Sequence, residues 1–245
     1  ENKLVVTAKH KTELGAGFMY LHTLNEISTI SDTAKNGVAL PYLYFQDNIS
    51  LSEKFTLRPG LRADFFGATE KIYLQPRISM VYRVGDFFKL TGAAGMYNQF
   101  VTKNMIMDAT GNYKLAWSLS NNSDIPVLSS TSYTLGISFN RNNFSASIEG
   151  YRRNINGIAR FHETTAGIIA YEGKSRTKGL DVFIKKEFKN QSFWITYTLS
   201  KSEEKFPYFP ADSYIPAMHD QRHEFKIAGL AKIKAFHFSA TYVFG

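Results

Sequence analysis

Apolar and polar residues alternate along many segments of the chain, each about ten residues long. In residues 131–140, TSYTLGISFN, the residues at alternate positions are aromatic or aliphatic, and Ser, Thr and Gly lie between them. Successive side chains of a β-strand point to opposite faces, so this period predicts strands rather than helices. The same alternation occurs in residues 55–65, 74–83, 180–188, 192–200 and 236–244, and less regularly in residues 38–50. We therefore expect an all-β chain of about 12 strands.

The connectors between these strands alternate between short and long. The short ones are residues 11–14, 52–54, 84–86, 141–143, 189–191 and 232–235. Between them lie residues 25–37, the shorter 67–70, and the long 99–130, 154–176 and 202–221. Outer-membrane barrels have short periplasmic turns and longer extracellular loops. The alternation favours an antiparallel up-and-down transmembrane β-barrel whose first strand runs toward the periplasm.

One face of the predicted strands is aliphatic and aromatic, and the other face carries most of the charges. In a barrel, the apolar face would meet lipid and the charged face would line the lumen. The candidate lumen residues are Arg58, Arg62, Asp64, Arg77, Arg83 and Glu149. Unpaired charge is costly where water is scarce. We expect these side chains to pair with one another.

A water-soluble β-sandwich shows the same alternation, with the apolar face packed in its core. Two features favour the barrel: Ser, Thr and Arg occur throughout the polar face, and aromatic residues mark the strand ends, as in membrane-interface girdles. These aromatics are Phe55, Phe65, Tyr73, Tyr82, Phe87, Tyr97, Phe188, Phe236 and Phe244. In residues 38–50 the period slips near Gln46, which suggests a β-bulge.

Composition excludes several classes of function. The chain has no cysteine, so it has no disulfide, thiol nucleophile or cysteine metal site. No apolar run approaches the ~20 residues of a transmembrane helix. The net charge is +8, but the basic residues are spread over all the strands, so we expect no nucleic-acid partner. Hydrolase, metalloprotease, P-loop and dinucleotide-binding motifs are absent from the sequence. We therefore expect that the chain is not an enzyme and binds no cofactor.

The segment HDQRHE, residues 219–224, crowds histidines and carboxylates together. The spacing of His219 and His223 would bring them together on a helix but not where a loop enters a strand. No third ligand is evident, so we predict no metal site. We expect Asp220 and Arg222 to pair at the rim of the barrel instead.

The long connectors hold the candidate ligand-binding residues. Residues 202–221 are rich in aromatic residues and proline, and exposed rings there could stack on sugars, peptides or a macrocycle. They could equally pack against neighbouring loops. The candidates are Phe206, Tyr208, Phe209 and Tyr214, with Trp117 from the connector 99–130.

Several segments, in their order and spacing, resemble the barrel of TonB-dependent outer-membrane receptors of the Bacteroidetes type. They are QDNISLSEKFTLRPGLRADFF at 46–66, LQPRISMVYRV at 74–84, SYTLGISFNRNNFSASIEGYRRNINGI at 132–158, GKSRTKGLDVFIKKEF at 173–188, YTLSKSEE at 197–204 and HDQRHEFKIAG at 219–229. The resemblance covers most of the chain. In this family, a run similar to HDQRHE opens a barrel strand.

The resemblance implies a bacterial outer-membrane importer with a barrel of about 22 strands. Residues 1–245 would be a partial barrel domain, without the plug domain and the final strands. The barrel would import a scarce solute of the siderophore, glycan or peptide class when energised TonB displaces the plug. The implied partners are outer-membrane lipid, TonB through a segment not in this chain, a surface lipoprotein, and the plug. The candidate lumen residues would contact that plug, as an alternative to pairing with one another. The alternatives are a passive porin and a soluble carbohydrate-binding β-sandwich.

Overall fold

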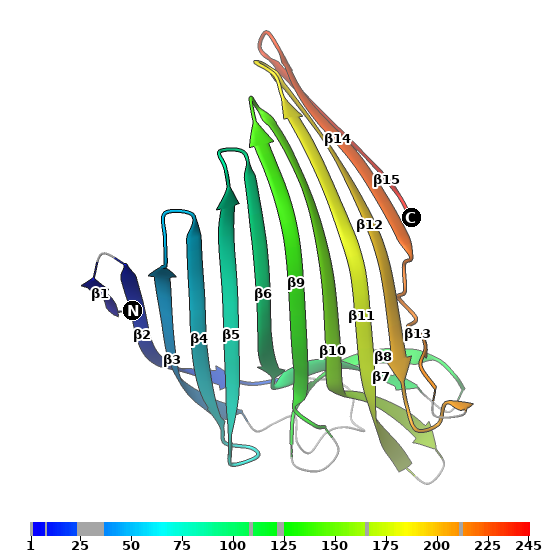
Figure 1. Cartoon of the computed structure of the whole chain (residues 1–245). Coiled ribbons are helices and arrows are strands. Elements are labelled where there is room, and N and C mark those ends of the chain that lie inside the picture. The colour runs from blue at the N-terminus through cyan, green and yellow to red at the C-terminus, as the bar shows by residue number, and fades with distance from the viewer. Residues whose placement is uncertain are drawn as a thin grey trace.

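The computed structural model is one curved sheet, antiparallel except where β7 joins β10, and open at both sides (Figure 1). The structure describes residues 2–7, 9–23, 37–107, 110–121, 125–164, 167–210 and 213–245. The strands are β1 Asn2–Thr7, β2 His10–Leu21, β3 Val38–Ser50, β4 Phe55–Phe66, β5 Lys71–Val84, β6 Phe88–Gln99, β7 Val101–Met107, β8 Tyr113–Leu119, β9 Leu128–Arg141, β10 Phe144–Thr164, β11 Gly167–Glu187, β12 Gln191–Lys205, β13 Ile215–Pro216, β14 His223–Ile233 and β15 Phe236–Phe244.

Twelve of these strands form the wall, in the order β1-β2-β3-β4-β5-β6-β9-β10-β11-β12-β14-β15. All neighbours in this order pair antiparallel, as expected for an up-and-down barrel. The predicted number of strands is therefore confirmed for the wall. Within the described residues, no helix is long and apolar enough to cross a membrane.

The apolar face of the wall is exposed, which excludes the sandwich interpretation for the described residues. Leu135 is 64% exposed, Ile137 42%, Phe193 46% and Phe238 55%, whereas a sandwich would bury all four. We call this apolar surface the outer face. The opposite surface, which carries Arg62, is the inner face. Such a broad exposed apolar surface is typical of a barrel wall that meets lipid.

Cross-strand register keeps the two faces separate across the sheet. On the outer face, Leu135 lies opposite Gly150, which lies opposite Leu180, which in turn lies opposite Leu199. On the inner face, Arg62 lies opposite Tyr44 on one side and Gln75 on the other. A one-residue slip would exchange the faces, so the alternating sequence fixes the register.

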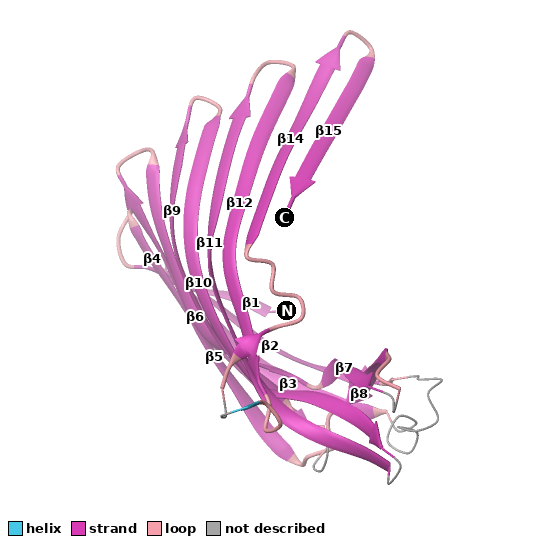
Figure 2. Cartoon of the chain, turned by 90° about the vertical axis from the view of Figure 1, so that its right-hand side faces the viewer, coloured by secondary structure: helices cyan, strands magenta, loops and turns pink. Residues whose placement is uncertain are grey.

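The hairpin of β7 and β8 leaves the wall and lies on the concave side of the sheet (Figure 2). Its base packs against the inner face, because Phe100 and Leu119 form a buried cluster with Leu40 and Phe66. A second cluster joins the hairpin to the extension of β10, where Ile106 and Ala116 pack with Ile125, Ala159 and Phe161. The hairpin therefore covers part of the inner face at the end of the sheet with the long connectors, which is the end expected to be extracellular.

Several predicted connectors are wrong. Residues 11–14 lie inside β2, and the connector 99–130 contains β7 and β8. β10 and β11 extend far into 154–176, and β12 continues to Lys205. Most of the predicted connector 25–37 lies outside the described residues.

The bulge predicted near Gln46 is also wrong. Pairing of β3 with β2 and with β4 keeps a constant register there, although the ladder with β4 skips Asp47 and Asn48. The residue that faces Asp47 in this register is Pro59, which has no N–H to donate. A register shift occurs in β10 instead, between Asn156 and Ile158, where Gly157 has a φ of 84°.

Two of the predicted girdle residues face inward. Tyr73 lies opposite Asp64 and packs against the Phe100 cluster. Tyr97 lines a cavity together with Arg62. The alternation places both tyrosines on the inner face, so neither belongs to a girdle that meets lipid.

Candidate ligand site at the extracellular mouth

A hollow of about 290 Å³ opens at the extracellular mouth, between the β7–β8 hairpin and the connector that follows β12. It is lined by Met105, Met107, Tyr113, Arg160, Phe161, His162, Glu204, Tyr208, Phe209, Ile215, Pro216 and Met218. Parallel pairing of β7 with the extension of β10 brings Met105 opposite Arg160. Methionine and aromatic side chains dominate the lining, which suits a ligand with flat or apolar groups.

His162 and Tyr208 line one side of this hollow, and the ring of Tyr171 packs against both of them. The ring centroids of His162 and Tyr171 are 5.1 Å apart, those of His162 and Tyr208 are 5.0 Å apart, and those of Tyr171 and Tyr208 are 4.9 Å apart. These tilted and edge-to-face contacts are favourable aromatic geometries. Tyr208 remains 38% exposed, so part of its ring is available to a ligand.

Phe206 supports this side of the hollow from beneath. It is 1% exposed, stacks on Tyr208 at 5.4 Å and lies against Gly173. A Cβ on Gly173 would lie 2.5 Å from the Phe206 ring, so a residue without a side chain is needed there. The Arg160 guanidinium lies 4.6 Å from the centre of the Phe206 ring.

The charges in the site neutralise each other. Arg160 Nη2 donates to Glu204 Oε2, and Arg160 Nη1 donates a weak hydrogen bond to Tyr208 Oη at 3.5 Å. The side chains of Arg160 and Glu204 are 17% and 11% exposed, respectively. A largely buried ion pair positions Tyr208 and leaves little net charge in the hollow.

The structure divides the five predicted ligand residues into three groups. Tyr208 and Phe209 line the hollow, and Phe206 lies beneath it. Tyr214 is elsewhere, with its ring 4.0 Å from the Arg176 guanidinium on the outer face. Trp117 is 48% exposed on β8 and does not line the hollow.

Arg160 and His162 were not among the sequence candidates. They lie in a segment that the sequence predicts as a connector, although polar Arg160 and His162 alternate there with apolar Ala159 and Phe161. That continuing period could have identified a strand. The shift at Gly157 obscures which face these residues occupy.

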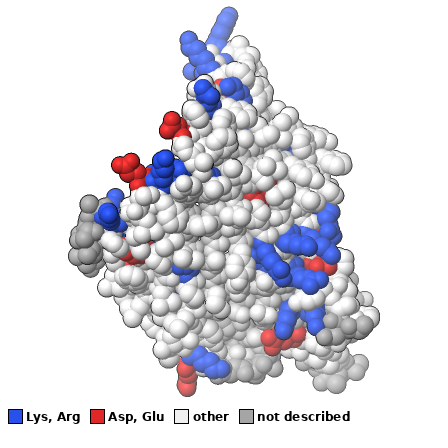
Figure 3. Space-filling model, in the orientation of Figure 1, with Lys and Arg blue, Asp and Glu red and all other residues white. Residues whose placement is uncertain are grey.

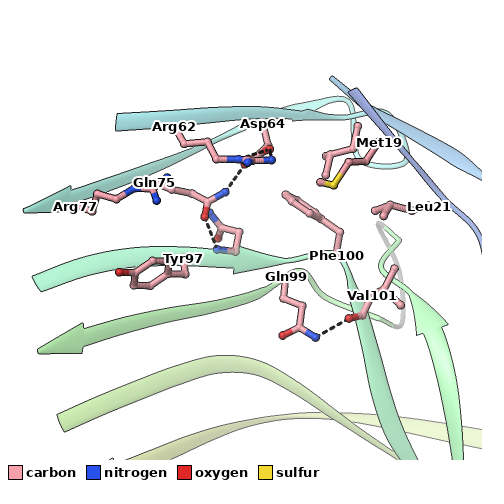
Figure 4. Close-up of a pocket in the computed structure, with 12 residues that line it drawn as sticks. Met19, Leu21, Arg62, Asp64, Gln75, Arg77, Tyr97, Gln99, Phe100 and Val101 are labelled. Atoms are coloured by element: carbon pink, nitrogen blue, oxygen red, sulfur yellow. Dashed lines mark hydrogen bonds and ion pairs between the residues drawn. The ribbon is translucent and has the colours of Figure 1, made fainter. Parts of the chain in front are cut away.

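The cross-strand register places the predicted lumen residues on the inner face. Two of them, Arg62 and Asp64, are paired with each other (Figure 4). Arg62 donates to both oxygens of Asp64, with Nη2 at 2.8 Å from Oδ1 and Nε at 3.1 Å from Oδ2. Asp64 is fully buried and also accepts from Gln75. The Arg62 guanidinium lies 3.9 Å from the centre of the Tyr42 ring. A cavity of about 370 Å³, lined in part by Phe100, adjoins this cluster.

The remaining lumen candidates are less constrained. Arg58 lies 3.9 Å from Glu13, and Arg83 donates to the backbone oxygen of Glu53 at a periplasmic turn. Within the part of the chain that the structure describes, Arg77 and Glu149 have no hydrogen-bond or ion-pair partner. Internal pairing thus accounts for Arg62 and Asp64 but not for Arg77 or Glu149.

The HDQRHE segment forms the rim at which β14 begins. Asp220 accepts from the backbone N–H of Ser202 at 2.6 Å and from Arg222 at 3.1 Å, so the expected pair forms. His223 Nδ1 lies 2.8 Å from Tyr197 Oη. Among the described residues, no three His, Cys, Asp or Glu side chains form a group that could hold a metal ion.

A family model described as "TonB dependent receptor-like, beta-barrel" matches residues 9–243. None of the curated proteins compared with the chain matches its sequence. Among solved structures, the chain is similar to the FrpB iron transporter from Neisseria meningitidis, with a TM-score of 0.64 and 10% identity. That alignment covers 95% of this chain and 39% of FrpB.

Two further structures share the fold. The siderophore receptor PirA from Acinetobacter baumannii has a TM-score of 0.55 and 14% identity, over 91% of this chain and 40% of PirA. The RagAB peptide importer has a TM-score of 0.58 and 10% identity, over 98% of this chain and 40% of that chain. The chain thus spans about two fifths of the length of these three structures.

Proposed function

Because this chain belongs to the TonB-dependent receptor β-barrel family, we propose that it supplies the wall and part of the extracellular mouth of an energised importer in the bacterial outer membrane. The observation that carries this proposal is the family match over residues 9–243. In the proposed mechanism, the mouth captures a scarce solute, and TonB then displaces a plug that closes the lumen. Plug and TonB contacts belong to the whole receptor.

The inner face offers charged groups for such a plug. Arg77 lies opposite Gly60, and no partner among the described residues holds its guanidinium. Glu149 is exposed on the inner face, opposite Asp181. A plug surface with complementary charges could pair with both groups through charge-assisted hydrogen bonds. Arg58 and Arg83 are further candidates, whereas Asp64 already holds Arg62.

The hollow at the mouth is the proposed site of solute capture. Its exposed Tyr208, together with the methionines of β7, favours a ligand with aromatic or flat apolar groups over a highly charged one. Relatives with this fold include siderophore receptors and a peptide importer. Siderophore, peptide and glycan classes all contain members with aromatic or flat apolar groups, and measured uptake distinguishes among the three classes.

A passive porin is the second candidate function, because the β7–β8 hairpin lies over the concave side of the wall, as a constriction loop would. The two functions differ in their energy requirement. Cells that carry the full-length receptor should accumulate a mixed panel of siderophores, peptides and glycans with TonB present and lose uptake without it. Uptake that continues unchanged without TonB would favour the porin.

The capture site has its own test in the same cells. Tyr208→Ala should weaken solute binding about 2- to 13-fold, since an aromatic contact contributes about 0.5–1.5 kcal/mol. Tyr214→Ala is the matched control, because Tyr214 contacts Arg176 on the outer face. If both variants lose solute binding to the same degree, the hollow is not the capture site.

A further inference from the structure

Three basic residues form a cross-strand row on the outer face at its extracellular margin. In the register of the wall, Tyr133 lies opposite Arg152, Arg152 opposite Lys178, and Lys178 opposite Lys201. We call Arg152, Lys178 and Lys201 the outer basic row. It lies two residues along each strand from the apolar row that contains Leu180. The apolar surface of the wall therefore ends where this row begins.

Figure 3 shows the same change on the surface. A broad uncharged band covers the middle of the outer face, and basic side chains gather over the lower parts of β11 and β12. Further toward the extracellular end, Arg176 lies opposite Glu203. The basic residues are thus concentrated at the boundary between the apolar band and the aqueous exterior.

Like charges placed directly opposite each other on neighbouring strands destabilise a sheet. The outer basic row and Arg176 place four cations around a single carboxylate, Glu203. Glu203 lies in the extracellular extension of β12. Lys201 and Arg176 both donate hydrogen bonds to its carboxylate and so lower the pKa of Glu203. The ionised Glu203 balances one of the four charges, so three positive charges are left over.

The uncompensated cations have room for an anion. A hollow of about 230 Å³ lies among them, lined by Arg152, Arg176, Thr177, Lys178, Lys201 and Glu203. Arg152 is exposed and makes a long hydrogen bond of 3.4 Å to Asn154. Lys178 is also exposed, and it has no ion-pair or hydrogen-bond partner among the described residues.

We propose that the outer basic row binds the phosphate groups of a phosphorylated lipid headgroup in the outer leaflet. Lipid surrounds the apolar band, so the first row beyond the band lies at the depth of the headgroups. Arginine binds phosphate with a planar fork of donors, and lysine adds a compact charge. A protein partner would have to displace the lipid headgroups there, so the position favours lipid.

The test uses the full-length receptor, purified in detergent micelles doped with a diphosphorylated glycolipid, and counts retained lipid by native mass spectrometry. The triple variant R152Q/K178Q/K201Q should retain the glycolipid at least tenfold more weakly than the wild type. A charge-matched control, R153Q/K185Q/K226Q, removes three cations from the inner face and should retain it normally. Heat-modifiable migration in gels checks that both variants fold.

Two further arms identify the chemistry of the ligand. The same glycolipid without its phosphates should bind the wild type no better than it binds the triple variant. Inorganic phosphate at the lipid concentration should not displace the glycolipid. The proposal would be overturned if the folded triple variant retained the glycolipid as well as the wild type does, or if the control variant lost as much glycolipid as the triple variant. It would also be overturned if the wild type bound the dephosphorylated lipid as well as the phosphorylated one. Displacement by inorganic phosphate would also overturn it, by identifying a site for free phosphate.

Discussion

Single residues on the inner face divide into a buried, paired group and an exposed group. Asp64 is fully buried and is held by Arg62 and Gln75, whereas Glu149 is exposed and has no partner among the described residues. Burial makes the first carboxylate dependent on its partners, because an isolated buried charge is costly. The two residues should therefore respond differently when their charge is removed.

We expect Asp64→Asn to lower the free energy of unfolding by about 2–3 kcal/mol, because the change leaves Arg62 without its carboxylate partner on a partly buried surface. The measurement is denaturant unfolding of the full-length receptor in lipid vesicles. Glu149→Gln is the control and should stay within about 0.5 kcal/mol of the wild type. A similar small effect for both variants would contradict a structural role for the Arg62–Asp64 pair.

The support of the mouth hollow depends on Gly173. Gly173→Val would push a side chain into the Phe206 ring and the backbone oxygen of Lys205, so we expect a loss of about 1–3 kcal/mol in stability and weaker solute binding. Gly150→Val is the control, because the nearest atom to its added Cβ, the oxygen of Leu135, would be 4.0 Å away. Thermal unfolding and binding assays should both separate the two variants.

The sequence allowed prediction of inner-face charges but not of all the residues at the mouth. Arg62 and Asp64 lie in a strand with clear alternation, so their shared face is readable. Arg160 and His162 lie beyond the membrane, where both faces meet water and the apolar signal weakens. Tyr214 was predicted in the same loop as Tyr208, but the loop sends the two rings to opposite faces.

At the scale of elements, prediction was accurate where strands cross the membrane. Predicted residues 55–65 correspond to β4, Phe55–Phe66, and predicted residues 236–244 match β15, Phe236–Phe244. Lipid on one side and water on the other impose the strict alternation that makes such strands visible. The β7–β8 hairpin escaped prediction because tertiary packing against β10 and the inner face holds it in place.

Phe100 anchors that hairpin, and its loss should free the hairpin without unfolding the wall. Phe100 is 5% exposed, with its ring centroid 4.6 Å from that of Phe66 and 5.2 Å from that of Tyr73. Phe100→Ala should cost about 3–5 kcal/mol of local stability by leaving a cavity. Hydrogen exchange should then accelerate in residues 101–119 and remain unchanged in β4.

A matched control uses an exposed phenylalanine at a periplasmic turn. Phe87 is 39% exposed, so Phe87→Ala should leave the hairpin's exchange rates unaltered. If Phe100→Ala accelerates exchange in the wall strands to the same degree, the hairpin and the wall unfold together. The hairpin would then contribute to the stability of the wall instead of opening independently of it.

For the whole molecule, the wall is inside-out relative to a soluble protein. Its large apolar side chains are exposed on the outer face, and the small buried clusters lie on the concave side beneath the hairpin and at the extracellular mouth. The stability of such a wall depends on the solvent at each face. The two faces of one strand should therefore tolerate the same substitution very differently.

Neighbouring residues on β12 test this directly. Ile195 lies on the outer face opposite Ile184 and Ile227, and Thr196 lies on the inner face opposite Lys226. Ile195→Arg should lower the free energy of unfolding from lipid vesicles by about 2–4 kcal/mol, because it places a charge in the hydrocarbon layer. Thr196→Arg should cost less than about 1 kcal/mol, because its charge would enter a water-filled lumen. In detergent, where the layer around the protein is thin and adaptable, the difference between the two should shrink. Equal costs in vesicles would mean that the outer face is not in contact with acyl chains.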